Sequence, residues 1–221
     1  MKKIFKKSPL IEGKGMQLFS DEEMIARKNI ESDEFEDLIG PENAEKIVTA
    51  CQNAFDTTWE AIRNRPPSYQ NFQWKANELN SNVQGQMTEA FPNNCGFLKG
   101  CRHRFYVDIA GQKLFCKQVD HKLNPKCATT RTVTMYDNQQ SDDVDETNPI
   151  TYIGYEVDPS YSALLGVYAI HYSGGKKWIS DLASLAYKGQ ASTCIPLMQT
   201  KDELNVSATP KKEIQRNTKI V

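Results

Sequence analysis

The chain contains 221 residues, of which 39% are hydrophobic and 25% are charged, and its formal net charge is −1. A chain of this length buries a sizeable core without disulfide or metal staples. No apolar run approaches the roughly 18 residues of a membrane span, so we expect a soluble protein without membrane contact. The near-neutral net charge argues against a protein that binds polyanions with its whole surface.

The small net charge hides four blocks of opposite sign. Residues 1–15 hold five lysines and one glutamate (+4), and residues 20–46 hold ten acids against three bases (−7). Residues 99–131 hold eight bases against two acids (+6), whereas residues 137–158 hold seven acids and no base (−7). Such asymmetry bears on partners and self-association rather than on the fold. The alternative is that these blocks are solvated faces that neutralise one another.

The N-terminal sequence predicts no export signal. Lysines 2 and 3 resemble the start of a signal peptide, but Lys6, Lys7 and Pro9 interrupt any apolar segment after them. Six cysteines are too few for a disulfide scaffold at this length, so we expect reduced thiols. These features predict a cytoplasmic location.

Helical spacing dominates the first part of the chain. A capping box at Ser20 and Glu23 predicts a short helix over 21–29. The clearest helix runs from Pro41 to about Arg65, where two prolines end it. Its apolar stripe consists of Ile47, Val48, Cys51, Phe55, Trp59 and Ile62. A second helix is predicted from about 75 to 91, with Leu79, Val83, Met87 and Phe91 at helical spacing and Gly85 as a weak point.

After residue 94 the period changes to that of strands. A hairpin is predicted around Ala110-Gly111, although alanine is a poor first residue for such a turn and a longer loop stays open. A second hairpin is predicted around Gly174-Gly175, which supply positive φ angles. The predicted strands cover 103–109, 112–119, 130–136, 150–157, 164–172 and 176–182, with an acidic loop over 137–148.

This order of elements predicts an α+β fold in which N-terminal helices pack on a five- or six-stranded antiparallel sheet. We expect a single domain over 21–198, with its helical part at 21–92 and its sheet at 101–187. Residues 1–20 form a flexible basic arm in this interpretation, and residues 199–221 form a disordered polar tail.

The first hairpin predicts a candidate binding surface. If its turn has two residues, one face of the pair is a core face that carries Phe105, Val107, Ile109, Leu114 and Cys116. The other face places two aromatic rings among cations, and it carries Arg104, Tyr106, Asp108, Lys113, Phe115 and Lys117. Such a face offers stacking platforms for bases and charges for phosphates. Alternatively, the cationic side chains cover the rings, or a second helical layer buries them.

A metal site is a further hypothesis, because cysteines and histidines are dense between residues 95 and 127. The candidate ligands are Cys95, Cys101, His103 and Cys127. Their spacing contains no Cys-x-x-Cys pair, and Cys116 falls on the predicted core face. We therefore expect no bound metal.

Catalytic signals are few. A metal-dependent nuclease would group Asp108 with Glu156 and Asp158 around a cation. A metal-free ribonuclease would use His103 and His121 as acid and base. No phosphate-binding glycine loop or dinucleotide motif occurs, so we expect no cofactor.

The resulting hypothesis is a non-enzymatic, intracellular binding or regulatory protein. Its basic, aromatic face within residues 99–131 would contact single-stranded nucleic acid or an acidic protein. The alternative from another class is a small nuclease with the residues named above. A protein–protein adaptor that self-associates through its charge blocks is a third hypothesis.

Overall fold

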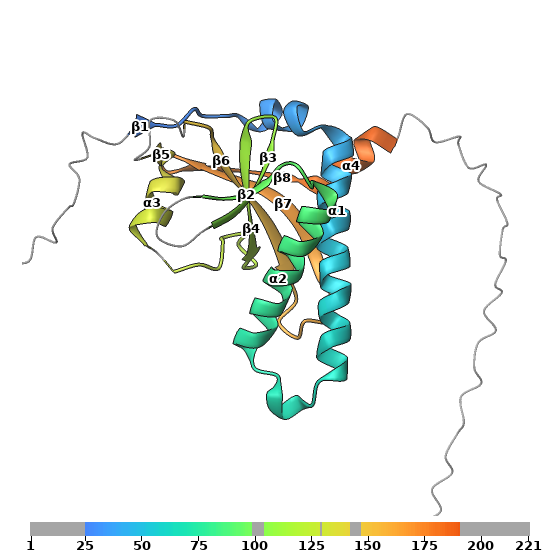
Figure 1. Ribbon diagram of the computed structural model, residues 1–221. Coiled ribbons are helices and arrows are strands. Elements are labelled where there is room, and N and C mark those ends of the chain that lie inside the picture. The colour runs from blue at the N-terminus through green and yellow to red at the C-terminus, as the bar shows by residue number, and fades with distance from the viewer. Residues whose placement is uncertain (1–24, 99–103, 129, 142–146, 191–221) are drawn as a thin grey trace, which may run out of the picture.

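The computed structural model describes residues 25–98, 104–128, 130–141 and 147–190 (Figure 1). The helices are α1 (Ser32–Asn64), α2 (Phe72–Ala90), α3 (Arg131–Asp137) and α4 (Leu182–Gln190), with a 3-10 turn η2 at Pro67–Tyr69. The strands are β1 (Ile25–Ala26), β2 (Cys95–Leu98), β3 (Arg104–Ile109), β4 (Gln112–Val119), β5 (Gln140–Ser141), β6 (Ile150–Val157), β7 (Leu164–Ser173) and β8 (Lys176–Asp181). None of the described helices combines the length and hydrophobicity that a membrane span needs.

Six strands form one sheet in the order β2-β3-β4-β6-β7-β8, and β1 pairs with β5 in a separate ribbon. The predicted α+β class with N-terminal helices on a six-stranded sheet is confirmed. One detail differs, because β4 and β6 run parallel while all other neighbours are antiparallel. A parallel pair requires a long crossover, and residues 120–149 supply it.

The helices cover both faces of the sheet. Helices α1, α2 and α4 pack on one face, in a core that includes Leu114, Cys116 and Tyr155. The other face carries a second core beneath α3, formed by Leu98, Phe115, Val119, Tyr136, Ile150, Tyr152 and Ile170. Strand β6 is buried along nearly its whole length because it lies between the two cores.

The two long predicted helices are confirmed. Helix α1 continues past Pro41 to Asn64, with Ile47, Cys51 and Phe55 buried as expected. An additional helical segment, Ser32–Ile39, precedes it, and Gly40 separates the two with a φ of 67°. Helix α2 contains the predicted stripe, of which Leu79, Val83 and Met87 are each 1% exposed.

Two predicted elements are wrong. Residues 130–136 were expected to form a strand, but 131–137 form α3, because the Thr130 side chain caps the helix by accepting a hydrogen bond from the Val133 amide. The described part of the predicted helix 21–29 is instead β1 and a loop. Arg27, only 6% exposed, ties this segment to the distant chain by donating hydrogen bonds to the Gln140 and Asn148 carbonyls.

Both predicted hairpins are confirmed. Ala110 and Gly111 form the two-residue turn with φ angles of 51° and 80°, and the Asp108 carboxylate accepts a hydrogen bond from the Gly111 amide at 3.0 Å. This bond stabilises a conformation that alanine rarely adopts. In the second hairpin, His171 pairs with Trp178, as expected from a turn at Gly174-Gly175.

His171 couples the sheet to the segment before α1. Its ring is 0% exposed, stacks on Trp178 at a centroid distance of 5.1 Å, and has Nδ1 3.0 Å from the Ile150 carbonyl and Nε2 3.0 Å from Asn29 Oδ1. Burial lowers the pKa of His171 below its ordinary value of 6.5, although the bond to Ile150 and the charge of Glu31 oppose this effect. The fold therefore favours the neutral ring.

Acidification below pH 6.5 is expected to lower the free energy of unfolding through His171. A depressed folded-state pKa contributes stability that is fully present above the unfolded value and is lost as pH falls through the folded value. Urea denaturation between pH 7 and 5 measures this loss. The His171→Gln variant should show a flatter profile of unfolding free energy against pH than the wild type. Equal slopes for wild type and His171→Gln would contradict the assignment.

Candidate anion-binding cleft

The candidate site is a cleft that opens where β3 and β4 separate. The antiparallel ladder between these strands consists of the three pairs nearest the turn and ends at Val107–Leu114. Toward Arg104, β3 stays paired with β2, while β4 follows β6 as far as Val119. A hollow of about 320 Å³ opens there, lined by Gln84, Arg104, Phe105, Phe115, Cys116, Lys117, Cys127, Ala128 and Thr130. We call it the β3–β4 cleft.

Two cations share this cleft. Burial lowers the pKa of Lys117, and the charge of Arg104 lowers it further, so the two groups repel each other. Within the described ranges neither side chain forms an ion pair with a carboxylate. Arg104 lies over the ring of Tyr136, 5.1 Å from its centroid. An anion in the cleft would relieve the repulsion between the two cations.

Asp137 compensates this charge only in part. Its carboxylate accepts a hydrogen bond from the Tyr152 hydroxyl at 3.0 Å. Burial raises the pKa of Asp137, while that bond and the charge of Arg104 lower it. Cys127 completes the cleft wall and is exposed as a residue, although its thiol is partly buried. This partial burial raises the pKa of the thiol, and the charge of Asp137 adds to the effect while the charges of Lys117 and Arg104 oppose it.

The five predicted contact residues do not form one exposed face. Phe115 is 1% exposed and packs in the second core against Tyr136, at a centroid distance of 5.3 Å. Lys113 is 8% exposed, and its Nζ lies 5.1 Å from the centre of the half-buried Tyr106 ring. Stacking of bases on Tyr106 and Phe115 side by side is therefore not supported, because α3 and the second core cover this face. Three of the five, Arg104, Phe115 and Lys117, line the cleft, and only Arg104 and Lys117 bring charge to it.

The carboxylates proposed for a metal-dependent nuclease do not converge. Asp108 pairs with Lys113, which lies beside Ile150, whereas Glu156 lies beside Val119 at the other end of β4. This offset of six positions corresponds to about 20 Å along the strand. The sheet thus places Asp108 far from Glu156.

Asp158 has a structural role instead. Its carboxylate accepts hydrogen bonds from the Ser160, Ser162 and Ala163 amides in the loop after β6. Although burial acts to raise it, these bonds and the Ser160 hydroxyl lower the pKa of Asp158 to about 2. The side chain closes this loop.

The remaining predicted ligands and catalytic residues are only partly described. Cys101 and His103 lie outside the described residues, so the metal-free ribonuclease stays a prediction. His121 is exposed in the loop after β4. The Cys95 thiol donates to the Met87 carbonyl at 3.5 Å, and no three potential ligands gather around a metal position within the part of the chain that the structure describes.

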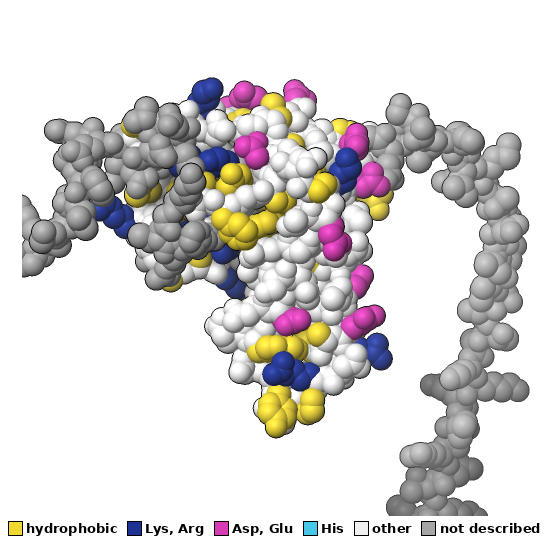
Figure 2. Space-filling model, viewed as in Figure 1, with side chains coloured by type: hydrophobic (Ala, Val, Ile, Leu, Met, Phe, Trp, Pro, Cys, Tyr) yellow, Lys and Arg dark blue, Asp and Glu magenta, His cyan; other side chains and the backbone are white. Residues whose placement is uncertain are grey.

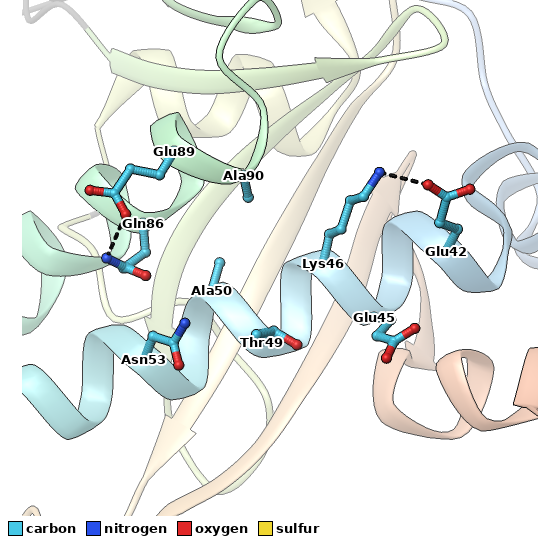
Figure 3. A pocket seen from close by; sticks show the side chains of 9 residues that line it. All are labelled: Glu42, Glu45, Lys46, Thr49, Ala50, Asn53, Gln86, Glu89 and Ala90. Carbon is cyan, nitrogen blue, oxygen red and sulfur yellow. Dashed lines mark hydrogen bonds and ion pairs between the residues drawn. The ribbon is translucent and has the colours of Figure 1, made fainter.

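A larger hollow, about 450 Å³, lies between α1 and α2 (Figure 3). Its floor consists of small residues such as Ala50 and Ala90. The carboxylates of Glu42, Glu45 and Glu89 point in different directions around that floor, and two of them bond locally, Glu42 to Lys46 and Glu89 to Gln86. The hollow therefore gathers no set of converging groups.

An aromatic residue beside the cleft falls in a segment for which no strand was predicted. Phe97 of β2 pairs with Phe105, which lines the cleft, and the two rings meet edge to face at 5.7 Å. Phe97 is 57% exposed. The short apolar run after the turn at 92–94 was the available signal, but four residues are too few for periodicity to identify a strand.

No protein family, curated protein or solved structure matches the chain.

Proposed function

We propose that the protein is a non-enzymatic binding protein for single-stranded nucleic acid, and that a backbone phosphate enters the β3–β4 cleft. The observation that carries this proposal is the pair Arg104 and Lys117, two half-buried cations in one hollow without an ion-pair partner among the described residues. Buried cations are normally paired. A phosphate offers both of them a charge-assisted hydrogen bond.

The neighbouring rings favour nucleic acid over an acidic protein. Phe97 exposes more than half of its surface next to Phe105 on the cleft wall. Stacking of a base on an exposed ring is independent of sequence and adds to phosphate contacts nearby. An acidic peptide would use the cations but would gain little from the ring.

A cytoplasmic location is part of the proposal. The four described cysteines, Cys51, Cys95, Cys116 and Cys127, are all free thiols, which is typical of a reducing compartment. Self-association through the oppositely charged blocks is also part of the proposal.

The affinity for a labelled single strand is expected to fall as the salt concentration rises. This salt dependence should be smaller after removal of the two cleft cations. Each lost phosphate contact reduces the slope of log affinity against log salt by about 0.7 for single strands. We define the cleft variant as Arg104→Gln with Lys117→Gln, and a matched control variant as Lys46→Gln with Lys188→Gln on α1 and α4. Fluorescence anisotropy across a salt series with RNA and DNA strands measures both.

The proposal would be overturned if the wild-type protein bound no strand at low salt. It would also be overturned if the cleft variant and the control variant lost equal amounts of affinity for the strand. Tight binding of polyglutamate without binding of a strand would favour the acidic protein partner instead. Recovery of the intact strand with and without Mg²⁺ is expected, and its cleavage would favour the nuclease.

A further inference from the structure

The connection between α1 and α2 forms a protruding tip on which hydrophobic and basic side chains lie next to one another (Figure 2). No acid occurs in residues 61–77, whereas acids line the outer edge of α1. The hairpin tip, as we define it, consists of Arg63, Arg65, Tyr69, Phe72, Trp74 and Lys75. Tyr69 is 64% exposed and Phe72 is 60% exposed.

Two of the cations of this tip, Arg65 and Lys75, and the neighbouring Lys126 lie over aromatic rings. The Arg65 guanidinium lies 4.3 Å from the centre of the Trp74 ring. Lys126, from the loop after β4, places its Nζ 5.9 Å from the centre of the Phe72 ring. Cation–π contacts leave the positive charge uncompensated, so the tip keeps an attraction for anions.

Phe72 is held in place although it is exposed. Its ring meets Tyr161 of the β6–β7 loop edge to face at 6.0 Å. Tyr161 is 1% exposed, and its hydroxyl donates a hydrogen bond to Oε1 of Gln118 in β4. A fixed, exposed ring loses little conformational entropy when a base stacks on it.

The tip is continuous with the β3–β4 cleft. Lys126 contacts Phe72, and the next residue, Cys127, lines the cleft. The Lys126 amide bonds to the Gln118 carbonyl of β4, which fixes this connection to the sheet. A basic and aromatic path therefore leads from Lys117 through Lys126 to Phe72.

From this continuity we infer that the hairpin tip is a second contact for the same single strand, with bases stacked on Tyr69 and Phe72 while a phosphate occupies the cleft. Arg65 presents its guanidinium plane beside them and binds the intervening backbone. This inference rests on the proposed function. It adds a length requirement, because only a strand long enough to leave the cleft reaches the tip.

The test uses the full chain and a labelled single strand of about twenty nucleotides. The tip variant, Tyr69→Ala with Phe72→Ala, is expected to weaken binding at least about tenfold, since stacking is typically worth ~1 kcal/mol or more per base. Its matched control is Tyr187→Ala with Leu165→Ala, at positions 69% and 55% exposed outside the path. With a dinucleotide, which fills only the cleft, wild type and tip variant should bind equally.

The outcomes separate this inference from the proposed function. If the wild type binds no strand, both fail. If the cleft variant weakens binding and the tip variant does not, the inference alone is overturned. It is also overturned if the tip variant abolishes sedimentation with phosphatidylserine vesicles but leaves strand binding unchanged, because the tip would then contact a lipid surface. Unchanged urea denaturation of the tip variant confirms that the fold is kept.

Discussion

Replacement of Phe115 by alanine is expected to lower the free energy of unfolding by about 3–5 kcal/mol, the usual cost of removing a buried phenylalanine ring. The ring is 1% exposed and packs against Tyr136 and Tyr152, with centroid distances of 5.3 and 6.2 Å. Its loss leaves a cavity between the sheet and α3. Urea denaturation measures the effect as a shift of the midpoint at constant slope.

Phe97→Ala is the matched control, because the same side chain is removed where it is 57% exposed. Its cost should be about 1 kcal/mol or less, since it loses mainly the edge contact with Phe105. Phe97→Ala should also lower the affinity for a single strand, because one base loses the ring on which it stacks. Equal losses of stability in the two variants would contradict the second core.

The thiol of Cys127 is expected to prefer a negatively charged disulfide reagent because of the cations beside it. In a background with Cys101→Ser and Cys194→Ser, the rate with dianionic dithiobis-nitrobenzoate is compared with the rate for neutral dithiodipyridine. The ratio removes the effect of the thiolate fraction. The cleft variant should lower this ratio about tenfold, as expected for charges a few ångströms away near a protein surface.

Two features make this measurement specific. Cys51 and Cys116 are buried and Cys95 is half-buried, so Cys127 is the exposed thiol among the described cysteines. The control variant changes the same number of charges on α1 and α4, outside the lining of the cleft, where Lys46 and Lys188 pair with Glu42 and Glu36. An unchanged ratio in the cleft variant, or an equal drop in the control, would contradict anion attraction by Arg104 and Lys117.

Elements with a local cause were predictable from the sequence. The stripe of α1, the proline stop after Arg65 and the glycine turn of β7–β8 each follow from neighbouring residues. By contrast, the threonines and Val133 of α3 favour a strand, whereas the cap at Thr130 and packing on the sheet stabilise a helix. The pairing of β4 with β6 joins residues that lie far apart in the sequence, so it leaves no local signal.

Of the candidate site, only the positive charge was predictable from the sequence. The basic block contains Arg104 and Lys117, but period-two alternation placed Phe115 on an open face. Alternation separates two faces without saying which one is covered. The divergence of β3 from β4, which creates the cleft, depends on β2, a strand too short to be foreseen.

The parallel pairing of β4 with β6 has a consequence for changes in chain length. No tight turn fixes the alignment of these two strands, since residues 120–149 lie between them. The alignment depends instead on matching two cores at once, because a slip by one position would exchange Tyr152 with Ile153 between opposite faces. Insertions in the crossover thus leave the sheet aligned, whereas a single inserted residue within β6 misplaces every side chain that follows it.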